Sequence, residues 1–219
     1  EEEEGEEREA SEEEDGYLVS NDDVSVPSSD TTYWCSTHQL EDRFSSKHHV
    51  LSYSPSISPG SEDLVHHMEV FHCASQQDVP LWSGSCGDPA APPALNTCKK
   101  VLAAWAIGAG TFSYPPEAGL ALGGPGAGGT VMLEVHYNNP GLRAGVVDSS
   151  GIRFLVTPNL RRHDAGILEL GLTYNDHMAV PPLQPAFPLS GVCSAQCTAV
   201  GLPRGGIRLF GSQLHTHGA

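Results

Sequence analysis

The chain has 219 residues and a formal net charge of −16, and most of that charge lies at its start. Residues 1–30 hold 14 acidic side chains against one Arg, so the remainder of the chain is nearly neutral. This distribution excludes a basic surface for nucleic acid. The sequence contains no apolar run of about 18 residues, so it predicts no membrane-spanning helix. The length is sufficient for one large domain or two small ones with a substantial core.

Residues 1–30 are predicted to form a solvated, disordered acidic tail. Their opening run, residues 1–7, has too few apolar side chains to bury and so cannot order itself. Calcium binding and protein docking are the alternative roles for this tail. No signal peptide is visible, and an extracellular protein needs one, so we expect the natural N-terminus to lie before residue 1.

The ordered part is expected to begin at residue 31, where β-forming residues run into a cysteine. Residues 100–107 contain alanines that permit a helix, but their short length and neighbouring strands favour a strand. Many short strands with Gly- and Pro-rich turns predict an all-β sandwich or jelly roll, with a domain boundary near Pro158 and Asn159. The other strands are expected at residues 48–53, 64–73, 131–137, 150–157, 167–174 and 207–217.

Six cysteines occur in the chain, and their even number without paired CxxC motifs favours disulfides over a zinc site. Six cysteines allow 15 pairings, and their spacing alone does not select one. They are Cys35, Cys73, Cys86, Cys98, Cys193 and Cys197.

Histidines gather on three of the predicted strands, among few charged neighbours, as metal ligands do. His215 and His217 project to the same face of a strand, about 7 Å apart along it, and can chelate one ion. His136 lies on a face that also carries Glu134 and Met132, and alone it is typical of a hydrogen-bonded histidine rather than a ligand.

His66 and His67 pose a geometric problem, because adjacent residues on a regular strand point to opposite faces. Both can bind one ion only at a twist, a bulge or a strand edge, or through different rotamers. An alternative arrangement places His66 on the outer face together with Met68 and His72.

Five stretches, taken in chain order, resemble the type II copper- and ascorbate-dependent monooxygenases. The similarity runs from about residue 31 to residue 217. Three shorter stretches, residues 31–35, 117–121 and 160–162, are most similar to the dopamine β-hydroxylase branch of that family and its paralogues, rather than to the peptide-hydroxylating branch. The five stretches are residues 65–73, 103–108, 134–140, 149–153 and 213–217.

The resemblance implies two copper ions per complete chain. His66, His67 and His136 match the ligands of the electron-transfer copper, and His215 and His217 match two ligands of the catalytic copper. The family's third catalytic ligand is a methionine further along the chain, which has no counterpart here, so we expect a truncated product. Zinc in a three-histidine site for hydrolysis is the alternative metal.

The implied fold is all-β, with two jelly-roll-like β-sandwich domains, the second incomplete. Residues 31–159 would hold the electron-transfer copper, and residues 160–219 would begin the domain of the catalytic copper. The implied disulfides are Cys35–Cys86 and Cys73–Cys98, which leaves Cys193 and Cys197 as free thiols in this chain.

The implied reaction hydroxylates the benzylic carbon of a phenylethylamine such as dopamine, using O2 as oxidant and ascorbate as electron donor. The alternative is a non-catalytic copper-binding secreted module, or an inactive fragment, because the second copper site is incomplete. The implied location is the secretory pathway, in a vesicle lumen or outside the cell. Membrane association and homo-oligomerisation of the full-length protein remain open at this point.

Overall fold

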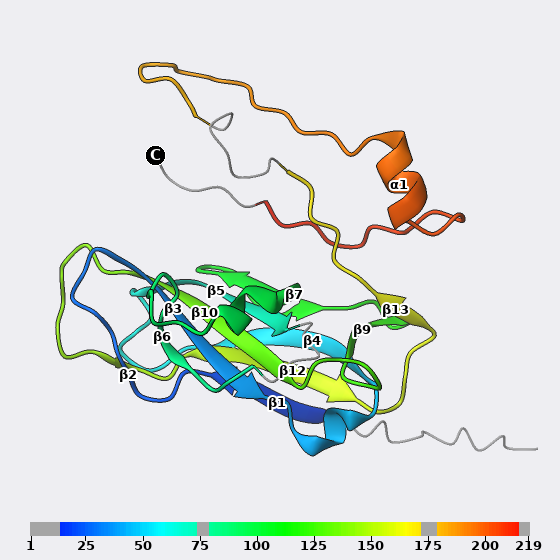
Figure 1. Ribbon diagram of the computed structural model, residues 1–219, viewed down its shortest axis with the longest axis horizontal. Coiled ribbons are helices and arrows are strands. Elements are labelled where there is room, and N and C mark those ends of the chain that lie inside the picture. The colour runs from blue at the N-terminus through cyan, green and yellow to red at the C-terminus, as the bar shows by residue number, and fades with distance from the viewer. Residues whose placement is uncertain (1–13, 74–78, 172–178, 215–219) are drawn as a thin grey trace, which may run out of the picture. The chain divides into compact units, whose positions relative to one another are not determined.

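The computed structural model describes residues 14–73, 79–171 and 179–214. The chain divides into two compact units, Glu1–Gly166 and Ile167–Ala219. Within the described residues, every strand belongs to the first unit, and the second unit contains one short helix (Figure 1).

Two sheets pack against each other in the first unit. The six-stranded sheet has the order β1–β12–β4–β9–β13, with β8 paired to β4, and the five-stranded sheet has the order β6–β3–β10–β5–β7. The strands of the first sheet are β1 (Asp15–Ser20), β4 (His48–Ser56), β8 (Phe112–Ser113), β9 (Ala118–Leu122), β12 (Gly151–Thr157) and β13 (His163–Ala165). Those of the second are β3 (Thr31–Gln39), β5 (Val65–Cys73), β6 (Ser83–Ser85), β7 (Cys98–Ala106) and β10 (Thr130–Asn138).

Three smaller elements complete the first unit. A two-stranded ribbon pairs β2 (Val24–Ser25) with β11 (Val147–Asp148). Two 3-10 helices, η1 (Asp42–Ser45) and η2 (Pro93–Thr97), lie in connections between strands. The all-β prediction is therefore confirmed, and residues 100–106 of the ambiguous segment lie in strand β7 rather than in a helix.

Alternate side chains of the two sheets meet in a shared apolar core, as expected when successive residues of a strand point to opposite faces. Along β10, Val131, Leu133, Val135 and Tyr137 are completely buried in this core. The residues between them therefore lie on the outer face of the five-stranded sheet, which is the face that carries the candidate site.

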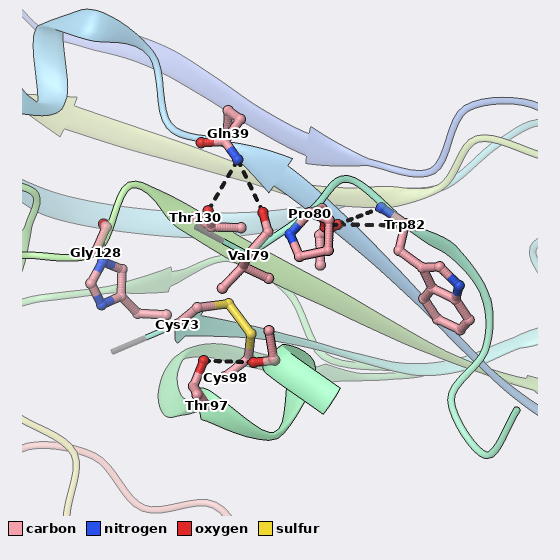
Figure 2. The surroundings of a disulfide bond; sticks show 12 residues. Gln39, Cys73, Val79, Pro80, Trp82, Thr97, Cys98, Gly128 and Thr130 are labelled. Carbon is pink, nitrogen blue, oxygen red and sulfur yellow. Dashed lines mark hydrogen bonds between the residues drawn. A yellow bond between two sulfur atoms is a disulfide. The ribbon is translucent and has the colours of Figure 1, made fainter. Parts of the chain in front are cut away.

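Part of this outer face is covered by the segment of residues 79–97, which one disulfide fastens to β3 and a second disulfide bounds where the chain enters β7. Cys35 is bonded to Cys86 and Cys73 to Cys98, so both implied pairings are confirmed. Figure 2 shows Gln39 donating to the Val79 carbonyl and to Thr130, which ties the same segment to β3 and β10. A small second core, separate from the main one, forms beneath this segment.

The prediction of a tail through residue 30 is wrong from Asp15 onward. Strand β1 pairs antiparallel with β12, and its Tyr17 and Val19 are buried in the main core. The acidic composition masked this short apolar run, in which Tyr17 and Val19 point inward and Leu18 between them is exposed. Residues 1–13 lie outside the described residues.

The second unit departs from the predicted strands. Residues 167–171 and 207–214, the described parts of two predicted strands, have no regular secondary structure. A strand needs a paired neighbour to satisfy its backbone groups, and the described residues of this unit supply none. Helix α1 (Ala195–Gly201) begins where a loop was expected, because the Ser194 side chain accepts a hydrogen bond from the Cys197 amide.

Cys193 and Cys197 are free and exposed in the second unit, as the resemblance implied for this chain. Among the described residues, no helix combines the length and the apolar character needed to cross a membrane.

The segment that follows β12 is fastened to the first unit, which extends past the predicted boundary at Pro158 and Asn159 to Gly166. Strand β13 pairs parallel with β9. The fully buried His49 accepts from the Arg161 amide through Nδ1 (3.0 Å) and donates from Nε2 to Asp164 (2.8 Å).

Replacing Asp164 with alanine is expected to loosen this segment without unfolding the unit. The change removes the acceptor of the buried His49 and the partner of Lys47 Nζ, which lies 2.6 Å from the carboxylate. Because the segment loses a charged hydrogen-bond acceptor, it should open more often, and trypsin is expected to cleave after Arg161 or Arg162 about tenfold faster. Mass spectrometry of the fragments would measure this rate. Asp63→Ala, which breaks the exposed pair with Arg143, is the control and should leave that rate unchanged. Equal rates in both variants would contradict the role of Asp164.

Candidate metal centre

Three aromatic side chains form a row across the outer face of the five-stranded sheet. His136 on β10 lies directly opposite His67 on β5 and directly opposite Tyr33 on β3. The Tyr33 ring stacks on the His136 ring, with centroids 4.5 Å apart and planes 13° apart. Because directly opposite residues on neighbouring strands share a face, the sheet itself brings His67 and His136 together.

A β-bulge turns His66 to the same face. His136 pairs with His67, but the next residue, Tyr137, pairs with Val65, so His66 is an extra residue in β5. Consequently the inward positions Val65 and Met68 are three residues apart instead of two, and both are completely buried. The required bulge is therefore present.

The alternative that groups His66 with Met68 and His72 is wrong. Met68 lies in the core, whereas His66 is exposed. His72 is buried further along β5, where its Nε2 donates to the Gly128 carbonyl at 2.8 Å. Burial lowers the pKa of His72, which is consistent with a neutral, hydrogen-bonded side chain.

The three imidazoles converge through their Nδ1 atoms. His67 Nδ1 lies 3.3 Å from His66 Nδ1 and 3.2 Å from His136 Nδ1. One imidazole nitrogen carries at most one proton, so His67 cannot donate to both neighbours. Metal–nitrogen bonds of about 2.0 Å at angles of roughly 90–120° would place ligand nitrogens about 2.8–3.5 Å apart. The donor set therefore fits one metal ion.

A second group of potential ligands in the described residues does not provide a metal site. Cys35, Cys86 and Glu134 have ligand atoms within 4.8 Å of one another. However, the two sulfur atoms are joined in a disulfide and cannot act as thiolates.

Two carboxylates occupy the next row of the outer face. Glu134 on β10 lies directly opposite Glu69 on β5, and each is two residues from a histidine of the cluster. Burial, together with the charge of Glu69, raises the pKa of Glu134 to about 7. Sequence reasoning placed Glu134 on the same face as His136 but missed its pairing with Glu69. The sequence did contain a signal for this pairing, because Glu69 and Glu134 are each two residues from a histidine of the cluster.

The raised pKa of Glu134 predicts that this carboxyl contributes a loss of stability to the metal-free protein as the pH rises from about 5 to 7. Burial lowers the pKa of His38 and of His72, and these two contributions act in the opposite direction. The unfolded chain releases the Glu134 proton near pH 4.5, whereas the folded chain retains it to about pH 7, so at this group the native state binds more protons across that window. We expect the Glu134 contribution to be a loss of about 2–3 kcal/mol, measured as the difference between wild type and Glu134→Gln in urea unfolding in a metal-chelated buffer. Glu134→Gln should flatten this dependence, whereas the exposed Glu117→Gln should preserve it. An unchanged slope in Glu134→Gln would contradict the assignment.

His215 and His217 lie outside the described residues. Their predicted role in a second metal site therefore stays a prediction.

Comparison with known proteins identifies the family of this chain. The profile for the N-terminal domain of copper type II ascorbate-dependent monooxygenases matches residues 17–144, and the profile for the C-terminal domain matches residues 163–219. The chain belongs to the copper type II ascorbate-dependent monooxygenase family. Membership favours copper over zinc for the histidine cluster.

Three relatives illustrate the extent of the similarity. The chain is 53% identical to dopamine beta-hydroxylase of Bos taurus over 196 residues, which is 89% of this chain and 32% of the relative. It is 49% identical to tyramine beta-hydroxylase of Caenorhabditis briggsae over 90% of this chain and 34% of the relative. It is 42% identical to human DBH-like monooxygenase protein 1 over 90% of this chain and 33% of the relative. The chain thus spans about a third of the length of these relatives.

Proposed function

We propose that His66, His67 and His136 hold the electron-transfer copper of a monooxygenase. The observation that supports this most directly is the convergence of three Nδ1 atoms on one outer face. Imidazole ligands suit copper in both of its common oxidation states, so a bound copper ion would accept and release single electrons at this position.

The protein's own contribution is to hold the three rings in place. His67 and His136 project from paired strands in the middle of the sheet, and Tyr33 stacks on one face of the His136 ring. His66 is exposed, so a small soluble donor such as ascorbate can approach the cluster from solvent. Rigid ligands lower the reorganisation that accompanies each electron transfer.

We further propose that His215 and His217 contribute to the second, catalytic copper site. The substrate class would be a phenylethylamine such as dopamine or tyramine, hydroxylated at its benzylic carbon with O2. Two relatives are a dopamine beta-hydroxylase and a tyramine beta-hydroxylase, which supports an amine substrate. The two disulfides are consistent with folding in the secretory pathway.

A non-catalytic copper-binding module is the second candidate. It is favoured by the contrast between the compact first unit, with its three converging histidines, and the second unit, whose described residues contain no strand. In this case the chain would bind copper at the first site and perform no oxygenation.

Copper content and oxygen consumption test these proposals together. The 219-residue chain is loaded with copper, dialysed and analysed by elemental mass spectrometry, and oxygen uptake is then followed with ascorbate and either dopamine or tyramine. About two copper ions per chain and amine-dependent oxygen uptake would support the monooxygenase. One copper ion without amine-dependent uptake would support the module, and no retained copper would overturn both.

A further inference from the structure

A buried polar network lies directly behind the histidine cluster, on the core side of β10. The hydroxyl of Tyr137 donates to Asp148 Oδ2 at 2.7 Å and accepts from Asn21 Nδ2 at 2.8 Å. Asn21 in turn accepts from Ser36 on β3 at 2.9 Å. The side chains of Tyr137 and Asp148 are completely buried, and Asn21 is 2% exposed.

The Asp148 carboxylate is held on both oxygens. Ser150 donates to Oδ1 through its hydroxyl at 2.6 Å and to Oδ2 through its amide at 3.1 Å. A phenol is protonated at neutral pH, so the Tyr137 hydroxyl donates to Asp148 while it accepts from Asn21. Each member would leave a buried polar partner unsatisfied if it moved, so the network fixes the position of Tyr137.

Tyr137 is also the residue at which the pairing of β10 with β5 shifts. In a regular antiparallel pair it would lie opposite His66, and His66 would then point into the core, away from the face of His67. Instead Tyr137 lies opposite Val65, and the next amide, of Asn138, donates to the Leu64 carbonyl at 2.8 Å. The shifted pairing is thus continued on the far side of the bulge.

We propose that Tyr137, anchored by Asp148 and Asn21, is a positioning residue that maintains the bulge and so keeps His66 on the same face as His67 and His136. This inference rests on the proposed copper site and adds to it residues that touch no metal. The network joins β10 to β11 and to the end of β1. Three segments that are distant in the sequence therefore determine whether His66 and His67 lie on the same face of the sheet.

Tyr137→Phe tests the proposal because it retains the ring and removes only the hydroxyl. We expect its affinity for copper at the first site to fall about tenfold, as for other changes behind a metal ligand, and the Cu(II) hyperfine splitting to change. Amide hydrogen exchange in residues 64–67 and 136–139 of the metal-free variant should become about tenfold faster. Asn21→Ala removes one hydrogen bond to the phenol and leaves Asp148 in place, so it should weaken copper binding about threefold. This variant provides the same comparison in the event that Tyr137→Phe does not fold.

Two further variants make the experiment selective. The Asp148→Asn side chain can still accept from Tyr137 and donate to Ser150, so this variant should retain a copper affinity within about twofold of wild type. Tyr53→Phe is the matched control: it removes the hydroxyl of another core tyrosine, which donates to the Ala104 carbonyl at 3.2 Å. It should leave the hyperfine splitting unchanged.

The proposal is overturned if Tyr137→Phe and Asn21→Ala match Tyr53→Phe in copper affinity, hyperfine splitting and exchange at the bulge. Failure of the copper assignment itself gives a different result, because wild type would then bind no copper at the first site. In that case the exchange measurement, which needs no metal, still decides whether the network maintains the bulge.

Discussion

Replacing His67 with alanine is expected to abolish stable copper binding by the first unit. His67 is central to the cluster, since its Nδ1 lies within 3.3 Å of the Nδ1 atoms of both His66 and His136. Four-ligand structural metal sites are worth about 10–16 kcal/mol in total, so one ligand contributes about 3 kcal/mol, or more than a hundredfold in affinity. Isothermal titration with a competing chelator would measure the loss.

His163→Ala is the matched control for this experiment. His163 is exposed on β13 in the other sheet, and its loss removes one imidazole from the chain without touching the cluster. Its copper affinity at the first site should equal that of wild type. Retention of wild-type affinity by His67→Ala would show that copper binds elsewhere in the chain.

Removing the Cys73–Cys98 disulfide is expected to produce a large loss of stability. The bond links residues 25 apart in sequence, and closing a loop of this length contributes about 3.5 kcal/mol in the chain-entropy description. Cys73 is also the last residue of β5, the strand that carries His66 and His67. The double variant Cys73→Ala/Cys98→Ala should therefore unfold at a clearly lower urea concentration than wild type. Tryptophan fluorescence would follow the unfolding.

Cys193→Ala/Cys197→Ala provides the corresponding control. It makes the same two substitutions at cysteines that are free and exposed in the second unit. The urea midpoint of the first unit should not change. If both double variants had equal midpoints, the disulfide would contribute nothing to the stability of the sheet.

Local patterns in the sequence were sufficient to predict most of the first unit. Alternation of apolar and polar residues predicted β5, β10 and β12, and the short length of residues 100–107 correctly favoured β7. Strand β1 was missed because the acidic residues around it dominate the composition, although residues 17–19 form a short apolar run of β-forming character. The second unit shows the converse error, since β-forming residues at 167–171 have no paired strand in the described part of that unit.

The sequence allowed us to predict which histidines form the cluster but not how they are arranged. The family resemblance selected His66, His67 and His136, and strand periodicity showed that adjacent histidines need an irregularity. Only the three-dimensional structure shows which residue is extra, because the bulge depends on how Tyr137 pairs across to β5. The opposed carboxylates of Glu69 and Glu134 likewise depend on register, which sequence spacing within one strand does not determine.

The disulfide at the end of β5 is sheltered from thiol reductants, because both of its cysteines are buried. Thiol–disulfide exchange requires a thiolate to reach a sulfur atom, and Cys73 and Cys98 are only 1% and 5% exposed, so a thiol in solution would attack this bond slowly. An enediol such as ascorbate gives up electrons one at a time and undergoes no thiol–disulfide exchange. The proposed copper site would therefore place two redox chemistries on one sheet face: a buried disulfide that stays oxidised, and a metal position that is reduced repeatedly.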